Sequence, residues 1–567
     1  MSGAKALIES LEQQNVEVIF GILGGAILPV YDVLCGNEKI RHILARHEQC
    51  AAHEAEGYAR ASGRVGVCMA TSGPGATNLV TGIANAYLDS SPMIAITGQV
   101  PADGVNTSYM IGKDAFQEAD IIGITTPITK HNYQPRSVAE IQPMVNAAFY
   151  IASTGRQGPV LIDMPKNVQS NVEDVETGLT IKTEARGYKP TLNPDLRKIS
   201  QAADLLAETT DPLILAGGGV ISANASDELV QLSDLLMAPV ATTFMGKGAF
   251  PEGHPLSLGC IGMHGNPAAN KLMGEADVLL AIGTRFSDRA TANLDTFAPN
   301  AKKIHIDVDA AEINKNIEID VPIVGDAKIS LKLLHAALVK KLPKMKVSGW
   351  VNRVKEAKEQ LSPMMKDRPR DIVPKALLIE LRKLLPADAI ITTEVGQNQM
   401  WSALYFQALK PRTFISSGGL GTMGFGFPAA IGAKVACPDR PVVDIAGDGS
   451  FIMSEQELAT SVTENVPVIV VVLNNSVLGM VAQWQRMLYK RRYMAVHLGK
   501  TPDFVKLAEA YGAAGIRVGS MEDFQKAVKT ALTNKTTTVI DVPIGSEEDV
   551  VPFVPPGCGL PQQKGDY

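Results

Sequence analysis

Aromatic residues make up only 5% of the 567-residue sequence, and its six cysteines are scattered without a CxxC pair. Evenly spaced or paired cysteines are the usual sign of a disulfide framework, so their absence argues against one. The thiols are expected to be reduced and to lie in the core or on the surface. They are Cys35, Cys50, Cys68, Cys260, Cys437 and Cys558.

Long hydrophobic runs are also missing. No segment reaches the ~18 uninterrupted apolar residues of a membrane-spanning helix, so no membrane span is expected. The first twenty residues, MSGAKALIESLEQQNVEVIF, are typical of an amphipathic helix that leads into a strand. They lack the apolar core of a signal peptide and the Arg/Ser bias of a transit peptide, which favours a cytoplasmic, prokaryotic protein. The net charge of −6 argues against nucleic acid as the main partner.

Apolar β-branched runs alternate with helical patterns along most of the chain. Such strands, separated by helices, predict parallel sheets covered on both faces, and fifty glycines suit the many tight strand–helix turns of an α/β protein. The runs are VEVIFGI, VGVCMAT, MIAITG, PVLIDMP, PLILAGGG, VLLAIG, KIHIDVD, AIITTE, PVVDIAG, VPVIVVVLNN and TTVIDVPI.

Two polar stretches divide this pattern. Residues 166–195 are polar and broken, and residues 340–372 form a basic, Pro-containing connection that we interpret as a solvated linker. The sequence therefore predicts three doubly wound parallel-sheet domains. Their boundaries are 1–165, 190–335 and 370–547, followed by a C-terminal tail over 548–567.

The segment GDGSFIMSEQELATSVTENVPVIVVVLNN, residues 447–475, joins two predicted buried strands. Asp448 follows the first strand and Asn475 the second. Ligands of parallel sheets bind at the carboxyl ends of the strands, and the oxygens of Asp and Asn suit Mg²⁺, which in turn holds a diphosphate. A helix opening at 454–458 would add an N-terminus that favours phosphate. Taken singly, each half also fits a plain turn or loop.

A buried carboxyl group is the second candidate feature. Glu48 follows the predicted strand RHILAR and begins a helix. In an apolar cleft its pKa would rise, as a proton relay requires, whereas the helix N-terminus would oppose that shift. The alternative is that Glu48 only supplies negative charge to the helix N-terminus. Glu54 and Glu56 on the same predicted helix show that acidic residues are common here.

Nearly the whole chain resembles the catalytic subunits of the acetohydroxyacid synthase (acetolactate synthase) family of thiamine-diphosphate enzymes. The similarity is carried by many collinear strings. They are FGILGGAILPVYDVL, ARHEQCAAHEAEGYARASG, TSGPGATN, DAFQEAD, KHN, GPVLIDMPK, AGGGV, GCIGMHGNPAAN, GTRFSDR, HIDVDAAEI, GGLGTMGFGFPAA, GDGSFIMSEQEL, LNNSVLGMVAQWQ and VPPG.

The resemblance implies a role for each candidate residue in thiamine diphosphate binding. Glu48 would protonate the aminopyrimidine ring, with Gly25 and Ala26 beside the reacting carbon and Phe116 and Gln117 reaching into the site. The metal ligands would be Asp448, Asn475 and the main-chain carbonyl of Val477. The remaining cofactor contacts would be Val395, Gly396, Gln397, Asn398, Gly421, Met423, Gly447, Gly449, Ser450 and Met480. The alternative for Met423 is a side chain that fills a gap in the core, which is the commoner use of methionine.

The implied reaction decarboxylates pyruvate and joins the remaining two-carbon unit to a second 2-ketoacid. Pyruvate then gives 2-acetolactate, and 2-ketobutyrate gives 2-aceto-2-hydroxybutyrate, in branched-chain amino acid biosynthesis. Trp484 would pack against the ethyl group of 2-ketobutyrate, and Arg289, with Lys130 nearby, would bind the second carboxylate. Without the resemblance, Trp484 reads as a core or interface aromatic.

The central segment resembles the domain that binds FAD in the biosynthetic enzymes, where the flavin has no redox role in the main reaction. Its candidate contacts are Gly217, Gly218, Gly219, Met263, His264, Arg285, Asp307 and Asp326. Ser287 stands where the family usually has Asp, and SVAEIQPMVNAAF lacks the Arg that the family aims at the flavin. The family's usual Tyr-Pro before Gly-Gly is absent from GILGG, Cys50 replaces a usual Gly, and Asn398 replaces a usual His.

Three other readings stay open at this point: a flavin-free catabolic acetolactate synthase, another 2-ketoacid carboligase or oxidase of this superfamily, and a non-catalytic cofactor-binding scaffold. The resemblance also implies a site shared between two chains, and so a homodimer or homotetramer. A small regulatory subunit is a further possible partner.

Overall fold

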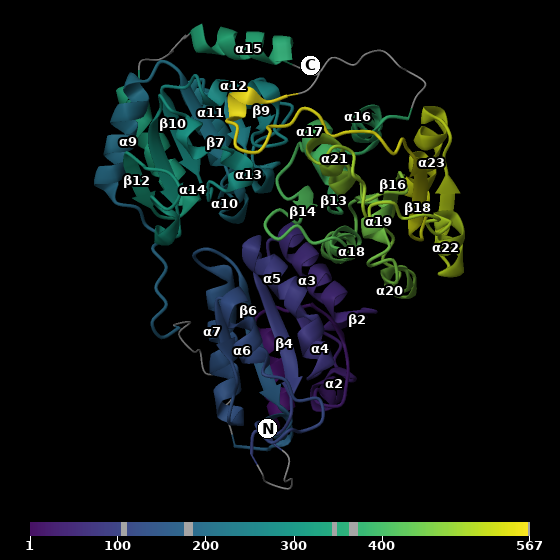
Figure 1. The fold of residues 1–567 in the computed structure, drawn as a ribbon. Helices are drawn as coiled ribbons and strands as arrows, with labels where there is room; N and C mark the ends of the chain where they lie inside the picture. Colours follow the sequence, from purple (N-terminus) through teal and green to yellow (C-terminus); the bar gives the residue numbers. More distant parts are fainter. Residues whose placement is uncertain (104–109, 175–184, 343–348, 362–371, 565–567) are drawn as a thin grey trace.

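The computed structural model describes residues 1–103, 110–174, 185–342, 349–361 and 372–564. Figure 1 shows three α/β domains, each built on a six-stranded parallel sheet with helices on both faces. The three-domain, doubly wound α/β architecture expected from the sequence is thus present. Each sheet lies within one of the three predicted segments.

The first sheet begins after an N-terminal helix, as the opening residues predict. Its strands are Val18–Ile22 (β1), Arg41–Leu44 (β2), Gly66–Ala70 (β3), Met93–Gln99 (β4), His131–Tyr133 (β5) and Pro159–Pro165 (β6). Its helices are Gly3–Gln13 (α1), Leu28–Leu34 (α2), Glu48–Ser62 (α3), Pro74–Asn78 (α4), Val80–Leu88 (α5), Ile121–Thr125 (α6), Ile141–Ser153 (α7) and Lys166–Ser170 (α8).

The central sheet is formed by Pro212–Ala216 (β7), Val240–Thr242 (β8), Ser257–Cys260 (β9), Val278–Ile282 (β10), Lys302–Asp307 (β11) and Val321–Val324 (β12). Its helices are Leu196–Glu208 (α9), Gly218–Ser222 (α10), Ser226–Leu236 (α11), Pro267–Met273 (α12), Asp288–Thr291 (α13), Ala327–Lys341 (α14) and Gly349–Leu361 (α15).

The third sheet comprises Ile390–Thr393 (β13), Phe414–Ser416 (β14), Val442–Gly447 (β15), Ile469–Asn474 (β16), Ala514–Arg517 (β17) and Thr538–Pro543 (β18). Its helices are Pro374–Leu384 (α16), Gln397–Tyr405 (α17), Gly426–Ala436 (α18), Asp448–Phe451 (α19), Glu457–Thr463 (α20), Gly479–Leu488 (α21), Phe504–Ala510 (α22) and Met521–Thr533 (α23).

Strand order separates the central domain from the other two. The first sheet has the order β2-β1-β3-β4-β6-β5 and the third has β14-β13-β15-β16-β18-β17, which is the same path through six strands. The central sheet, β12-β11-β10-β7-β8-β9, follows the 3-2-1-4-5-6 order of dinucleotide-binding folds. The direction in which the chain adds successive strands to the sheet reverses between β1 and β3, between β7 and β10, and between β13 and β15. Ligand sites are therefore expected outside the carboxyl ends of these three strand pairs.

The segment 340–372 differs from the predicted solvated linker. Residues 343–348 and 362–371 lie outside the described part, but helix α15 between them buries Trp350, Val354 and Ala357 against the central domain. The indole nitrogen of Trp350 donates a hydrogen bond of 2.9 Å to the carbonyl of Pro212. An amphipathic stripe of one Trp, one Val and one Ala is too sparse to stand out among the surrounding lysines. The predicted polar connection at 166–195 likewise includes residues 175–184, which are not described.

Helices α3 and α18 hold the first and third domains together (Figure 1). A Cβ atom added at Gly57 would overlap the backbone of Ala429, and one added at Gly432 would overlap the backbone of Glu54. Glycine at these two positions lets the helix backbones touch. The two domains therefore form a single packed body within one chain.

An unusual pair of acids is buried in the same contact. Glu54 is fully buried, and neither of its carboxyl oxygens receives a hydrogen bond from an N–H or O–H group. The carboxyl group of Glu457, at the start of α20, lies beside it and accepts hydrogen bonds from the backbone N–H groups of Arg46 and His47. Burial, and next the charge of Glu457, raises the pKa of Glu54 well above 4.5. Two carboxyl groups can hydrogen-bond to each other only when one keeps its proton.

Replacement of Glu54 by Gln tests this retained proton. Because the folded state keeps a proton that the unfolded chain loses near pH 4.5, the wild type loses stability as pH rises from that value toward the raised pKa. Glu54→Gln removes the effect. The stability of the variant relative to the wild type should therefore increase with pH, by at most about 1.4 kcal/mol per pH unit. Denaturant midpoints at pH 5, 6, 7 and 8 measure it.

The control is Glu509→Gln on the exposed surface of α22, which should follow the wild type at every pH. Parallel pH curves for Glu54→Gln and the wild type would show that Glu54 ionises in the folded protein as freely as in the unfolded chain.

Candidate active site

The first half of the site lies at the carboxyl edge of the first sheet. After β1, the backbone N–H of Ala26 donates a hydrogen bond of 3.3 Å to Thr71 Oγ1, which follows β3. Gly25 is in open space beside this contact. Gln117 packs against Gly73 of the neighbouring turn, in a left-handed conformation with φ 60°. The switch point between β1 and β3 thus gathers the residues predicted from two separate strings.

Glu48 is at this edge and begins helix α3, as the sequence predicts. His47 caps the helix, with its ring nitrogen accepting a hydrogen bond from the N–H of Gln49. The half-buried carboxyl of Glu48 accepts a hydrogen bond of 2.9 Å from Asn78 Nδ2, and its other oxygen lies near Gly75. The carboxyl group is therefore held in one orientation but is still partly accessible.

The second half lies at the carboxyl edge of the third sheet. Asp448 directly follows β15 and is 1% exposed. One of its oxygens accepts a hydrogen bond of 2.8 Å from the N–H of Ser476, which lies just beyond β16. Burial raises the pKa of Asp448 to about 6, because no described cation balances its charge. A bound cation would supply that balance.

The backbone N–H of Asn475 donates a hydrogen bond to the Asp448 carboxyl group. The amide oxygen of Asn475 accepts a hydrogen bond of 3.2 Å from the N–H of Val477, while its amide nitrogen faces Gln397 Oε1 at 3.4 Å. No group of three or more His, Cys, Asp and Glu side chains that could hold a metal exists among the described residues. The donor set is instead one carboxylate, one amide and backbone carbonyls. Mg²⁺ accepts such a set when phosphate oxygens complete its coordination.

The residues after β13 complete this edge. Gly396 has φ 150°, which L side chains rarely adopt, and Asn398 donates hydrogen bonds of 2.8 Å to the carbonyls of Glu394 and Ile445. Asn398 therefore ties the ends of β13 and β15 together. Gln397 reaches across to Gln483 on α21 and to the carbonyl of Glu548. The remaining predicted contacts on this domain are Val395, Gly421, Met423, Gly447, Gly449, Ser450 and Met480, and each lies in a loop or first helical turn at or near this edge.

The chain between Asp448 and Asn475 contains one more helix than the sequence predicts. The structure has two short helices, α19 directly at Asp448 and α20 beginning only at Glu457. The N-terminus of α20 faces the first domain, where Glu457 accepts the N–H groups of Arg46 and His47. Helix α20 therefore starts within the predicted residues 454–458, but its N-terminus faces the first domain. The apolar pattern was correct, but it did not reveal that the chain turns between Ile452 and Gln456.

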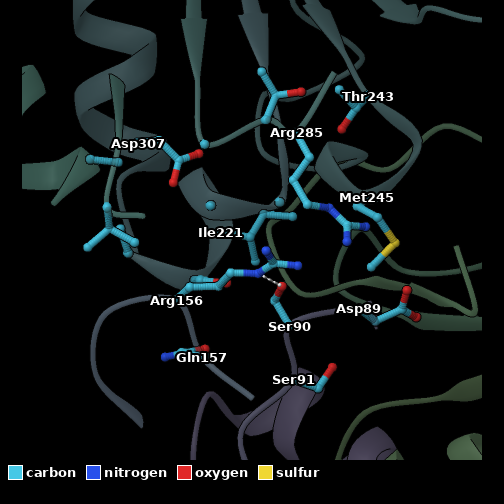
Figure 2. Close-up of a pocket in the computed structure, with 18 of the residues that line it drawn as sticks. Asp89, Ser90, Ser91, Arg156, Gln157, Ile221, Thr243, Met245, Arg285 and Asp307 are labelled. Atoms are coloured by element: carbon cyan, nitrogen blue, oxygen red, sulfur yellow. Dashed lines mark hydrogen bonds between the residues drawn. The ribbon is translucent and has the colours of Figure 1, made fainter. Parts of the chain in front are cut away.

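A cavity of about 390 Å³ lies at the switch point of the central domain, between β7 and β10. Residues of the other two domains also line it. Figure 2 shows side chains from the first and central domains pointing into it. Of the eight residues predicted to contact FAD, five line this cavity. They are Gly218, Gly219, Arg285, Asp307 and Asp326.

The glycines after β7 shape the cavity floor. A Cβ atom at Gly217 would overlap the backbone of Gly283, and one at Gly219 would crowd the same residue. The turn after β7 and the turn after β10 therefore touch through their backbones. Gly283 itself has φ 56°, in the left-handed region. Only small residues allow a ligand to approach the main chain this closely.

Sequence reasoning missed an arginine at this cavity. The Arg sought within residues 137–149 is absent, but Arg156 reaches the cavity from the turn between α7 and β6 (Figure 2). It donates a hydrogen bond of 3.0 Å to Ser90 and pairs with Glu312 at 2.8 Å and with Asp309 at 3.5 Å. The signal was the string GRQGPV, in which Arg precedes a buried strand. Arg60 and Arg412 also line the cavity, together with the acids Asp89, Asp307, Glu312 and Asp326.

The other three predicted flavin contacts, Gly217, Met263 and His264, lie outside the lining of the cavity. His264 is half-buried and faces Trp484, with ring centroids 6.3 Å apart. Burial, and next the charge of Arg289, lowers the pKa of His264 to about 4. Arg289 itself lines the cavity with a largely exposed side chain. The structure thus brings a predicted flavin contact and two predicted substrate contacts together.

Lys130 lies elsewhere. Its ammonium group donates hydrogen bonds to the carbonyls of Ile151 and Thr154 and to the hydroxyl of Tyr188. Lys130 precedes β5 and is therefore at the amino edge of the first sheet, opposite Glu48. A substrate carboxylate would have to replace those three hydrogen bonds. Lys166, by contrast, directly follows β6 at the carboxyl edge and is exposed.

Comparison with known proteins agrees with this arrangement. Residues 1–124 match the N-terminal TPP binding domain of thiamine pyrophosphate enzymes, residues 199–334 match the central domain, and residues 394–542 match the C-terminal TPP binding domain. The chain belongs to the acetolactate synthase family of thiamine pyrophosphate enzymes.

Three relatives show how close this relationship is. The "Probable acetolactate synthase large subunit" of Methanocaldococcus jannaschii is 52% identical over 567 residues, covering 99% of this chain and 94% of the relative. The acetolactate synthase large subunit of Corynebacterium glutamicum is 47% identical over 564 residues, covering 98% and 89%. That of Parasynechococcus marenigrum is 46% identical over 572 residues, covering 100% and 91%.

The first and third domains match the TPP binding domains of this family, which identifies thiamine diphosphate as the cofactor. The carboxyl edge of the first domain provides the half-buried acid Glu48, and that of the third domain provides the oxygen cluster of Asp448 and Asn475. As expected, no helix in the described part of the chain is long and apolar enough to cross a membrane. All six cysteines are free.

The oxygen cluster can be tested by binding. Asp448→Asn keeps the size of the side chain but removes its charge, so thiamine diphosphate should bind about 10- to 100-fold more weakly in the presence of Mg²⁺. Isothermal titration calorimetry at a fixed Mg²⁺ concentration measures this. Asp439→Asn, at an exposed position before β15, is the control and should bind as the wild type does. Equal affinity for Asp448→Asn and the wild type would remove Asp448 from the diphosphate site.

Proposed function

We propose that this protein catalyses the thiamine-diphosphate-dependent synthesis of acetohydroxyacids. It decarboxylates pyruvate and joins the two-carbon unit either to a second pyruvate, giving 2-acetolactate, or to 2-ketobutyrate, giving 2-aceto-2-hydroxybutyrate. One CO2 leaves in each case. The observation that carries the proposal is the pairing of Glu48 at one switch point with the Asp448–Asn475 cluster at another. A non-catalytic scaffold would not need both.

Bound thiamine diphosphate supplies a carbon nucleophile and an electron sink for the decarboxylation. The task of this chain is to orient and protect that chemistry. Glu48, fixed by Asn78, holds a proton at the aminopyrimidine ring. Gly25 leaves open space beside the reacting carbon. No side chain needs to act as a nucleophile.

The third domain would hold the diphosphate through Mg²⁺. Asp448 and Asn475 provide side-chain oxygens, and Val477 provides a main-chain carbonyl from the same loop. The burial of Asp448 supports this assignment, since a nearby cation would stabilise its charge beyond what its backbone hydrogen bonds supply. Gly396 and Gly447, which have no side chains, leave room for the phosphates.

The second 2-ketoacid would bind near Trp484 and Arg289. Arg289 offers a guanidinium group to the carboxylate, and the half-buried indole of Trp484 offers an apolar face to the substrate's alkyl group. Contact of one extra methylene with such a face favours 2-ketobutyrate over pyruvate by about 1–3 kcal/mol.

The central cavity fits FAD. Its 3-2-1-4-5-6 strand order, its glycine turn and its arginines match what a dinucleotide requires. Arg285 and Arg156 would contact the phosphates, and Asp307 and Asp326 would accept hydrogen bonds from hydroxyl groups. The flavin would be structural, because no step of the reaction changes oxidation state through it.

The two halves of the thiamine diphosphate site would be joined by a second copy of this chain. Within one chain, the start of α3 beside Glu48 packs against α20 instead of against the Asp448 edge. Both edges leave apolar side chains uncovered. Phe116 is 88% exposed at the first edge, and Leu420 and Met453 are 42% and 53% exposed at the second. A homodimer, or a homotetramer built from it, would cover both.

A small regulatory subunit is a further proposed partner. Relatives of 46–52% identity carry the name "large subunit", which implies a smaller one.

Product analysis tests the reaction directly. Purified protein is incubated with thiamine diphosphate, Mg²⁺ and equimolar pyruvate and 2-ketobutyrate, with and without FAD, and the two acetohydroxyacids are separated. We expect mainly 2-aceto-2-hydroxybutyrate, a requirement for FAD, and yellow protein that releases flavin on denaturation. Trp484→Leu should lower the ratio of acetohydroxybutyrate to acetolactate about tenfold or more. Tyr489→Leu, exposed just beyond α21, should leave the ratio unchanged.

Acetolactate alone, unaffected by FAD, would assign the protein to the catabolic branch. Formation of neither product, with thiamine diphosphate binding confirmed, would exclude acetohydroxyacid synthesis.

Mixed dimers test the shared site. Glu48→Gln and Asp448→Asn should each abolish most activity. When the two variants are co-expressed, each mixed dimer contains one site with both changes and one intact site. About one quarter of the wild-type activity should then return. If both halves of a site came from one chain, no intact site could form and no activity would return.

A further inference from the structure

The C-terminal tail connects the third domain to the central domain. After β18 it passes over α17 and α21 and then crosses to α12 and β9, as the yellow segment of Figure 1 shows. The N–H of Val554 donates a hydrogen bond of 2.7 Å to the carbonyl of Met263. Gln563 donates to the carbonyl of Gly265 and accepts from Asn270. The tail is therefore an ordered strap with anchors on both domains.

On the third domain the strap is attached to the helix that carries Trp484. Gln483 accepts a hydrogen bond of 2.8 Å from the N–H of Val550 and donates one of 3.0 Å to the carbonyl of the same residue. Arg486, one turn further along α21, pairs with Asp549. Residues 549–550 thus set the position of α21 directly on either side of Trp484.

The strap also contacts the indole itself. The ring of Phe553 meets the ring of Trp484 edge to face, with centroids 5.8 Å apart and planes at 84°. Phe553 is 8% exposed, and its backbone is paired with Lys564 by two hydrogen bonds of 2.8 Å. His264 of the central domain completes the cluster, 6.5 Å from Phe553. One side of the indole is thus supported, while Trp484 as a whole stays half-buried.

We propose that Phe553 is a positioning residue for the second 2-ketoacid, which sets selectivity by holding the indole of Trp484 against the tail. This inference rests on the function proposed above. An aromatic side chain can favour a larger substrate only if its face stays where the extra methylene arrives. A T-shaped contact from a residue fixed at its own backbone supplies that restraint.

The test replaces Phe553 in the full-length protein. Phe553→Ala should lower the ratio of acetohydroxybutyrate to acetolactate about two- to tenfold in the equimolar competition, because the edge-to-face contact is lost. The rate of acetolactate formation from pyruvate alone should stay within about twofold, since the ethyl group is then absent. Phe553→Leu, which retains apolar contact, should fall between the variant and the wild type.

Val554→Ala is the matched control. Val554 is the next residue of the strap and is buried in the central domain away from Trp484, so its truncation loosens the strap without removing the aromatic contact. Its product ratio should equal that of the wild type. An unchanged ratio in Phe553→Ala, or an equal fall in Val554→Ala, would overturn the inference.

Tryptophan fluorescence gives an independent reading. The chain has three tryptophans; Trp350 and Trp401 are 5% and 3% exposed, so quenching by acrylamide reports mainly on Trp484. Phe553→Ala should increase quenching, and the increase should vanish in a Trp484→Leu background. If the wild type made no acetohydroxyacid, the proposed function would fail, but unchanged quenching in Phe553→Ala would still separately refute the contact.

Discussion

The direct backbone contact between α3 and α18 is the constraint on which the rest of this structure depends. Gly57 and Gly432 let the two helices approach until main chain meets main chain. Helix α3 begins with Glu48 at the carboxyl edge of the first sheet and ends near the central cavity, where Arg60 lines the wall. One helix therefore connects Glu48, the third domain and the central cavity. A side chain at either glycine would separate all three.

The same contact is the basis for the proposed pairing of two chains. With α3 packed along α18, the start of α3 faces α20, and the edge that carries Asp448 points elsewhere. In the proposed dimer, each chain would contribute two half-sites, whose apolar side chains are exposed in the single chain. The repeated strand order of the first and third sheets makes this arrangement natural, because two similar domains can pair again across a two-fold axis.

The central domain and the tail complete the assembly from the opposite side. The central sheet directs its own switch point toward the amino edge of the first sheet, where Ser90 and Arg156 meet it. The tail then returns from the third domain and is seated on the loop at Met263. His264, Trp484 and Phe553 come from three distant parts of the chain and meet only because of this return. In the proposed function, substrate selection would thereby be linked to the central domain.

The sequence alone determined the fold class, because long apolar strands can be recognised from the sequence. The strands that fall on predicted runs are β1, β3, β4, β6, β7, β10, β11, β13, β15, β16 and β18. It also determined the chemical groups at the strand ends, since Glu48, Asp448 and Asn475 directly follow strands that a pattern can find. Short edge strands such as β5 and β14 have too few apolar residues to be recognised. Helix α15 was hidden among lysines for the same reason.

Only the tertiary structure decided which of these groups meet. Lys130 and Lys166 are equally plausible in the sequence, yet one precedes its strand and the other follows it, so they lie at opposite edges of the same sheet. Arg156 reaches the cavity from a different domain, and Phe553 reaches Trp484 through a tail that carries no motif. A local pattern shows only which residues are neighbours along the chain. Contacts between domains depend on how whole sheets pack, and no local pattern contains that information.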